Sequence, residues 1–202
     1  MRRADLQLNN RKALLEAAIG AIAARGHQST RLSELADQVG LTTGAIYSIF
    51  GSKRALMIAA IQHLVADFQQ SLAPLLDDPG LDLAEVLRGY ADAALGSAGG
   101  ARAYQVFAFE LDILGAALRD PQLRADIAAE VPRRLPTLIA LCTGRRIDPD
   151  GTHTTTADQA RRLAPAVDAL VTGFAQHAVL EPDSVDRDYV LESTVALITL
   201  VR

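Results

Sequence analysis

The residues with the most evident chemistry in this sequence lie close together, between positions 42 and 48. Thr42, Thr43, Tyr47 and Ser48 carry hydroxyl groups that donate and accept hydrogen bonds, and Gly44 has no side chain to hinder a close approach of the backbone. Such hydroxyls can bond to the edges of DNA bases and to backbone phosphates. To act together, they must be held on one surface by a common element.

That element is predicted to be a helix over residues 42–50. The residues expected on its inner side are Ala45, Ile46, Ile49 and Phe50. Thr42 stands where its hydroxyl can cap the first turn, and the hydroxyls described above are left to point outward. The preceding segment, 31–38, has the periodicity of a second amphipathic helix of about two turns.

Gly40 separates these two predicted helices and can take the positive φ with which a helix often ends. Two short helices joined by a turn that contains glycine form a helix-turn-helix, whose second helix can enter the major groove of DNA. Helix pairs of the same spacing also occur in all-α proteins that never bind DNA. The spacing alone therefore leaves both interpretations open.

Residues 14–60 resemble the N-terminal domain of TetR-family transcriptional repressors. The features that match in order and spacing are LLEAA at 14–18, Arg25-Gly26, Thr30, LADQVGL at 35–41, Gly44-Ala45-Ile46-Tyr47 and Phe50-Gly51-Ser52-Lys53. The remainder of the chain resembles the family only in length and helical character. Thr43 and Ser48 stand where the family often has larger polar residues.

The resemblance implies a homodimer that binds a double-stranded DNA operator, with a phosphate contact at Lys53. Together with the outward residues of the predicted helices, it gives a set of candidate DNA-binding residues. They are Thr30, Arg31, Ser33, Thr42, Thr43, Gly44, Tyr47, Ser48 and Lys53.

The charge of the chain is unevenly distributed. Residues 1–54 hold eight Lys and Arg against four Asp and Glu, a balance of +4, whereas the whole chain has 20 against 24, which leaves −8 for the remainder. A basic end joined to an acidic remainder suits a module that meets phosphate. A modest positive balance is also ordinary for a solvated surface.

The composition predicts an all-α protein, because half of the residues are hydrophobic, only 4% are aromatic, and Ala and Leu predominate. We expect an N-terminal three-helix DNA-binding domain, residues 1–53, and a larger C-terminal helical domain, residues 54–202, for effector binding and dimerisation. Residues 1–9 are expected to be disordered and the first helix to begin at Asn10. Pro132 and Pro136 should split a later helix.

Residues 144–156 combine Gly, Pro, Asp and Thr, and they predict a mobile surface loop. A long helix is expected to begin after Ser52, which can cap it, and to continue to Pro74. It would link the two domains mechanically.

A pocket for a small-molecule effector is expected between helices of the C-terminal domain. Its candidate residues are Arg88, Tyr104, Phe107, Glu110 and His177. The alternative is that Tyr104 and Phe107 fill the core, while Arg88 pairs with Glu110 or Asp112.

The last two predicted helices, 157–182 and 185–201, carry broad apolar faces that could close the core of their own chain. The TetR resemblance implies instead a four-helix interface between two subunits. The candidate interface residues are Ala166, Leu170, Gly173, Phe174, His177, Tyr189 and Leu197.

Motifs for catalysis, metal binding or a cofactor are missing from the sequence: it has no HExxH, no paired-cysteine spacing, no G-x-S-x-G and no glycine-rich phosphate loop. We therefore expect neither an enzyme nor a metal or cofactor. His177 and Glu181, four residues apart, are more readily an ion pair than a metal site. A single cysteine, Cys142, excludes an intramolecular disulfide.

The sequence shows neither the pattern of a signal peptide nor an apolar run of the ~18 residues that a membrane span needs, so a cytoplasmic location is expected. The leading hypothesis is a TetR-like repressor, dimeric on a palindromic operator and released by a small-molecule effector. The alternative is a helical ligand-binding or adaptor protein that no longer binds DNA.

Overall fold

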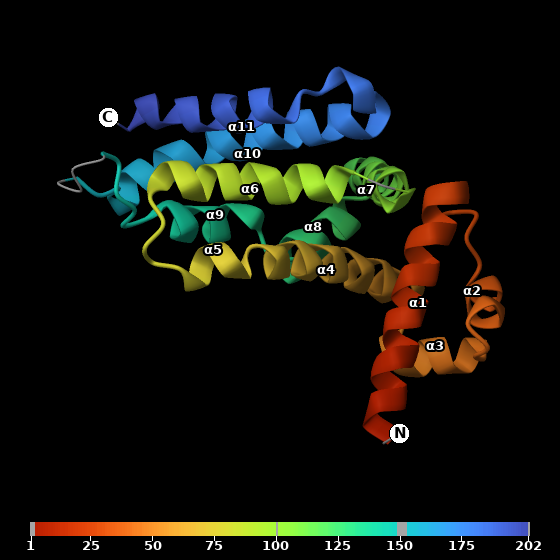
Figure 1. The fold of residues 1–202 in the computed structure, drawn as a ribbon. Helices are drawn as coiled ribbons and strands as arrows, with labels where there is room; N and C mark the ends of the chain where they lie inside the picture. Colours follow the sequence, from red (N-terminus) through yellow and green to blue (C-terminus); the bar gives the residue numbers. More distant parts are fainter. Residues whose placement is uncertain (1–2, 100, 149–152, 202) are drawn as a thin grey trace. The chain divides into compact units, whose positions relative to one another are not determined.

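The computed structural model describes residues 3–99, 101–148 and 153–201 (Figure 1). These residues form helices, and the β-type pairing among them is a single isolated bridge between Arg146 and Thr154. The predicted all-α class is thus confirmed. The chain divides into two compact units, a first one of Met1–Val65 with Tyr104–Pro132 and a second one of Ala66–Ala103 with Arg133–Arg202.

The first unit contains the three N-terminal helices and two helices from the middle of the chain. Its elements are α1 (Arg3–Arg25), α2 (Leu32–Gln38), α3 (Thr43–Phe50), the first part of α4 (Lys53–Ser71), most of α7 (Ala101–Arg119) and α8 (Pro121–Glu130). Helix α1 begins at Arg3, so the expected disorder of residues 1–9 is wrong for the described part of that segment. The helices α2 and α3 begin one residue later than predicted.

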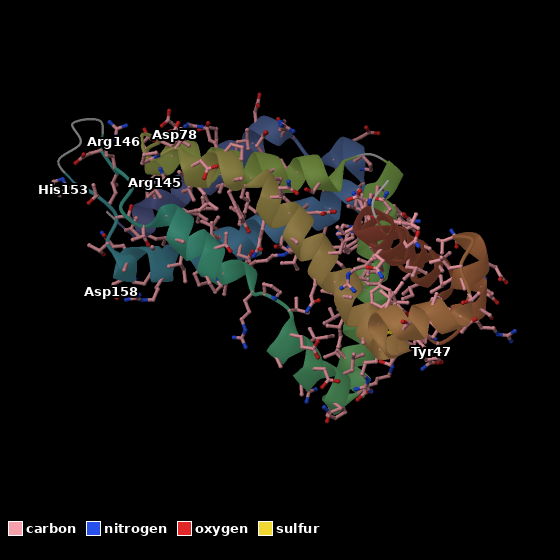
Figure 2. The ribbon with its side chains drawn as sticks, turned by 90° about the horizontal axis from the view of Figure 1, so that it is seen from below. Tyr47, Asp78, Arg145, Arg146, His153 and Asp158 are labelled. Carbon is pink, nitrogen blue, oxygen red and sulfur yellow. The ribbon has the colours of Figure 1, made fainter. Side chains whose placement is uncertain are left out.

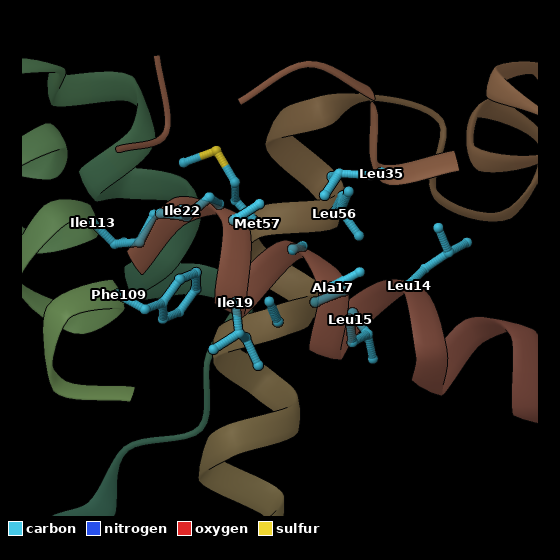
Figure 3. Packing of buried hydrophobic residues seen from close by; sticks show 14 of the residues in the cluster. Leu14, Leu15, Ala17, Ile19, Ile22, Leu35, Leu56, Met57, Phe109 and Ile113 are labelled. Atoms are coloured by element: carbon cyan, nitrogen blue, oxygen red, sulfur yellow. The ribbon is translucent and has the colours of Figure 1, made fainter. Parts of the chain in front are cut away.

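The core of the first unit joins the helix-turn-helix to α7. Ile19 of α1 and Met57 of α4 lie in one buried cluster with Phe109 of α7, which is fully buried (Figure 3). Ile46 of α3 belongs to the same cluster. Residues more than 50 positions apart in the sequence therefore hold the N-terminal helices in place. The packing unit around the helix-turn-helix is larger than the predicted functional domain 1–53, whose boundary remains a prediction.

The turns of the first unit follow the predicted local chemistry. Gly40 has φ +68°, and the Thr42 hydroxyl oxygen accepts a hydrogen bond from the Ala45 N–H at 3.2 Å. The Ser52 hydroxyl oxygen accepts one from the Ala55 N–H at 3.0 Å. Each side chain satisfies a backbone donor that the start of a helix leaves unpaired. These caps set the starts of α3 and α4.

The second unit is a bundle of the remaining helices. They are the end of α4, α5 (Ala73–Asp77), α6 (Leu83–Ala98), α9 (Arg134–Cys142), α10 (Ala157–Leu180) and α11 (Arg187–Ala196), with 3-10 turns η1 (Pro182–Ser184) and η2 (Leu197–Leu200). Helix α6 packs against α10 and α11, and α9 packs against α10 (Figure 1). The predicted break near Pro132 is confirmed, because α8 ends at Glu130 and α9 starts at Arg134. The predicted long helix ends at Ser71, short of Pro74.

Residues 144–148 and 153–156 correct the expectation of a mobile loop at 144–156. Arg145 is 8% exposed, and its guanidinium donates to the main-chain carbonyls of Leu75 and Asp78, with Nη2 2.7 Å from the Leu75 oxygen (Figure 2). Thr155 is also buried, and its hydroxyl donates to the Arg145 carbonyl. The segment is anchored because one buried cation satisfies carbonyls that a helix end leaves free. Residues 149–152 lie outside the described part.

Candidate nucleic-acid interface

Helix α3 separates an inner apolar side from an outer polar side. Ile46 is fully buried, whereas Tyr47 is 54% exposed and points outward at the edge of its unit (Figure 2). Gly44 and Ser48 are exposed, and Thr43 is half-buried at the margin of the outer side. The predicted outward set therefore lies along one face of a short helix, where small hydroxyls can reach base edges.

Thr42 and Gly44 shape the start of this face. The Thr42 oxygen serves as the cap acceptor, so its hydroxyl proton remains available to donate. A Cβ added at Gly44 would meet only the Thr42 hydroxyl oxygen, at 3.8 Å. The first turn of α3 thus presents backbone with open space beside it, which permits close approach of a partner.

Helix α2 and the residue before it add two exposed side chains to the candidate interface, whereas the third candidate in this region, Thr30, is buried. Arg31 precedes the helix and Ser33 lies in its first turn, both exposed. Thr30 is only 2% exposed, and its hydroxyl donates to the Gly26 carbonyl at 2.9 Å. The structure thus gives Thr30 a role in closing the turn after α1.

Contacts from α1 hold α2 and α3. The Arg11 guanidinium lies over the Phe50 ring, 4.7 Å from its centroid, and the Arg25 guanidinium is 2.9 Å from the Glu34 carboxylate. A cation over an aromatic face adds attraction to the apolar packing. Helix α3 is therefore supported by an α1 side chain that lies outside the helix-turn-helix.

Lys53 opens α4 directly after α3 and is half-buried. Partial burial lowers the pKa of its ammonium group, although the Asp112 carboxylate opposes this shift. Among the described residues, the Lys53 ammonium group forms no hydrogen bond and no ion pair within 4 Å. Its charge is thus free to meet an anion from outside.

A histidine–carboxylate contact and a pair of arginine–carboxylate ion pairs join the N-terminal module to α7 and α8, and no sequence pattern indicated them. The His27 N–H and its ring Nδ1 both lie 2.8 Å from Asp112 Oδ2. Arg54 reaches Asp120 at 2.7 Å and Asp126 at 3.0 Å. These partners are 66 to 85 residues apart in the chain, so no local pattern could reveal them.

The carboxylates around Arg54 are held in their charged form. The Leu123 N–H, and then Arg54, keep the pKa of Asp120 below its usual value. Hydrogen bonds from Arg54 and Gln122 lower the pKa of Asp126. Because all three groups stay ionised at neutral pH, the link between the starts of α4 and α8 persists there.

The five candidate effector residues are divided between the two units. Tyr104, Phe107 and Glu110 lie on α7 in the first unit, whereas Arg88 and His177 belong to the second. They therefore do not line one cleft within either unit. Arg88 pairs with Glu192 of α11, with Nη2 3.0 Å from Oε1, so the predicted pairing with Glu110 or Asp112 is wrong. Asp112 is occupied by His27.

The candidate dimer residues lie on the outer side of the second unit. Ala166, Leu170, Phe174 and Leu197 are half-buried, and Gly173, His177 and Tyr189 are exposed. The Phe174 and Tyr189 rings meet edge to face, with centroids 6.0 Å apart. This aromatic pair connects α10 to α11, and Tyr189 remains 63% exposed.

Helix α10 is unusually apolar for its exposure. Among the described residues it is the helix that is by itself long and apolar enough to cross a membrane, with a mean hydropathy of 1.3 over 18 residues, of which 22% are buried. No such segment was expected from the sequence, but the alanines, valines and leucines of α10 outweigh the charge of Asp168 in the mean hydropathy. That carboxylate accepts a hydrogen bond from the buried Tyr90 hydroxyl at 3.0 Å. One side of α10 is thus part of its unit's core.

Comparison with known proteins identifies the N-terminal helices. Residues 14–60 match the sequence model of bacterial regulatory proteins of the TetR family. No curated protein matches the chain. The matched residues include α2, α3 and the support from α1, which are the elements that build the candidate interface.

Solved structures share the fold over nearly the whole chain. A member of the TetR family from Streptomyces coelicolor A3 is 25% identical, with a TM-score of 0.69 over 93% of this chain and 97% of that one. A TetR-like transcriptional regulator from Rhodococcus sp. RHA1 is 20% identical, with a TM-score of 0.64 over 94% and 93%. The multidrug binding protein EbrR, solved with imidazole, is 23% identical, with a TM-score of 0.61 over 94% and 89%. The chain therefore carries a TetR-family helix-turn-helix domain at residues 14–60, and its fold is that of TetR-family transcriptional regulators.

Proposed function

We propose that this protein is a transcriptional repressor that binds a palindromic operator as a homodimer and is released by a small-molecule effector. The observation that carries the proposal is the outer face of α3, where Gly44, Tyr47 and Ser48 are exposed and Lys53 follows without an ion-pair partner among the described residues. Hydroxyls and open backbone suit base edges, and the ammonium group suits a phosphate.

The outer side of α10 and α11 supports the dimer. One recognition helix covers only a few base pairs, so useful specificity needs two of them about one helical turn of DNA apart. Leu170, Phe174 and Tyr189 offer apolar surface that the second unit leaves partly uncovered. A second copy of the same surface would bury it in an interface with two-fold symmetry.

Helix α4 supports the link to an effector. It starts at Lys53 in the first unit and ends at Ser71 in the second. A ligand that prefers one position of α4 over another would change the separation of the two recognition helices, and only such a preference can shift the equilibrium. EbrR, solved with imidazole, is a protein of this fold that holds a small molecule.

The direct test is selection of bound fragments from the source genome, followed by a titration of the best fragment monitored by fluorescence anisotropy. We expect a palindromic site, one dimer per site, and an affinity that falls steeply with salt. A helical ligand-binding or adaptor protein would retain no fragment above the background of an unrelated acidic protein. That result would reject the proposal.

A pair of glycine variants then locates the interface. Gly44 in α3 and Gly96 in α6 are both exposed helical glycines, and neither has a neighbour that an added methyl group would strike. Alanine should raise the stability of each helix slightly. Gly44→Ala should weaken operator binding by about tenfold, a loss comparable to one base contact, and Gly96→Ala should leave it unchanged. Equal affinities for the two variants would place the DNA elsewhere.

A further inference from the structure

The first unit contains a cleft that the proposed DNA interface does not use. Its volume is about 540 Å³, and it lies between the turn after α1, the start of α4 and the junction of α7 with α8. Its lining residues are His27, Gln28, Lys53, Arg54, Met57, Ala116, Arg119, Asp120 and Leu123. A cleft of this size falls within the range of small-molecule sites.

The charges on its walls are not balanced. Three cations, Lys53, Arg54 and Arg119, face one lining carboxylate, Asp120. Arg54 pairs with two carboxylates, Asp120 and Asp126 behind it, and Asp112 behind the wall contacts His27 at 2.8 Å.

Two cations remain unpaired in this lining. Neither Lys53 nor Arg119 forms an ion pair or a side-chain hydrogen bond within the described part of the chain, although Asp112 interacts with Lys53 electrostatically. Partial burial already disfavours the charge on Lys53, so a ligand anion would be stabilised there more than in water.

The floor of the cleft is apolar. Met57, Ala116 and Leu123 are each at most 5% exposed and belong to the core cluster of the first unit, where Figure 3 shows Met57 close to Ile22. A bare inorganic ion would gain nothing from such a floor, whereas an attached hydrocarbon chain or ring would lose contact with water. We propose that this cleft is a ligand site for a small monoanion with an apolar body, such as a medium-chain carboxylate, whose charged group pairs with Lys53 and Arg119.

The proposal also predicts an effect on DNA, and this part rests on the proposed function. Lys53 is both a wall of the cleft and the expected phosphate contact. A carboxylate that pairs with Lys53 removes that charge from DNA, so anion and operator should compete. The anion would act in the first unit itself and would need no movement of the second.

The chain provides its own probe for the cleft. It has two methionines, Met1 and Met57, and Met57 lines the cleft. With ¹³C-methyl methionine, the NMR spectrum contains two methyl signals, which the variant Met57→Leu assigns. Titration with octanoate, without DNA, should shift the Met57 signal saturably.

Probe chemistry tests each part of the proposed ligand. Acetate and inorganic phosphate, which lack an apolar body, should bind at least tenfold more weakly than octanoate. Octylamine has the same chain with the opposite charge and should not shift Met57. Equal shifts with octanoate and octylamine would overturn the anion site, and equal affinities for acetate and octanoate would overturn the apolar floor.

Variants locate the charge. Arg119→Gln, and the double variant Lys53→Gln with Arg119→Gln, should lower octanoate affinity at least tenfold. Arg124→Gln is the matched control, because Arg124 is exposed on α8 and does not line the cleft. Circular dichroism checks that the variants remain folded. Because Arg119 is exposed, Arg119→Gln should not disturb the fold. A Met57 shift that survives in both Arg119→Gln and the double variant, or that never saturates in wild type, would overturn the proposal.

Anisotropy with operator DNA forms a separate arm. Octanoate should weaken operator binding by wild type and have at least fivefold less effect on Lys53→Gln. The NMR titration needs no DNA, so a protein without DNA binding could still pass it. If the protein binds operator DNA but octanoate does not shift the Met57 signal, the proposed function stands and the anion site is rejected.

Discussion

Helices α3 and α10 both leave one side uncovered by their own unit, and the two uncovered sides differ in chemistry. Helix α3 presents hydroxyls, open backbone at Gly44 and the ring of Tyr47. Helix α10, whose mean hydropathy is 1.3 over 18 residues, presents Leu170, Phe174 and other apolar side chains. The α3 side can replace its bound water with hydrogen bonds to a partner, whereas the α10 side can replace it only with apolar contact.

A DNA groove is charged and hydrated, so a protein surface that meets it must return hydrogen bonds to base edges and phosphates. The core of a protein interface excludes water and gains from apolar area. The contrast therefore assigns different partners: nucleic acid to α3 and a second copy of the chain to α10. Substitutions in either helix can test this assignment.

The largest expected effect comes from placing a charge on the α10 side. Phe174→Asp should convert dimers into monomers and lower operator affinity by at least a hundredfold, because a monomer holds one recognition helix and a buried carboxylate is costly. Light scattering gives the mass, and anisotropy gives the affinity. Leu197→Asp should act in the same direction.

A matched control separates loss of the interface from loss of the fold. Gln176 is exposed, and it lies two residues beyond Phe174, about 200° round the helix. Gln176→Asp should remain dimeric, and circular dichroism should show equal helicity for both variants. Wild-type protein that is monomeric at micromolar concentration and still binds a palindrome tightly would remove α10 from the assembly.

A smaller effect is expected at Thr43. Thr43→Ala should change the preferred base at one position of each half-site by roughly 1 to 3 kcal/mol, since that residue lies at the margin of the outer face. Repeating the fragment selection with the variant measures the change. If wild type and variant selected the same sequence, α3 would dock by a different edge, and Tyr47 and Ser48 would be the next residues to replace.

The sequence was sufficient where the determining interactions are local. Gly40, Thr42 and Ser52 act within four residues of themselves, and the predicted turn and caps were all confirmed. Apolar periodicity likewise gave α2 and α3 nearly to the residue. Short-range hydrogen bonding and helix geometry explain this success, because neither depends on the rest of the fold.

The sequence failed where partners are distant. Arg88 was expected to pair with an acid on the next helix, but it pairs with Glu192, 104 residues away. The buried Arg145 satisfies carbonyls that lie 64 to 70 residues earlier. Contacts of Arg88 and Arg145 depend on how helices pack, which local sequence patterns do not specify. Thr30 is a local exception: it matched a motif, yet its hydroxyl donates to the Gly26 carbonyl four residues earlier, and its side chain is buried in that turn.

The smallest effect is expected at Lys53, whose charge would help to position the protein on the DNA backbone without distinguishing between base sequences. Lys53→Ala should weaken operator and random DNA by the same few-fold factor, and it should lower the magnitude of the slope of log affinity against log salt by about one per subunit. Arg124→Ala, a change of charge on α8 away from α3, should leave the slope unaltered. The uniform loss would distinguish Lys53 from Thr43, whose replacement changes preference between sequences. An unchanged slope in the Lys53 variant would show that the polar side of α3 meets DNA without α4, and it would leave the cleft as the only role for that ammonium group.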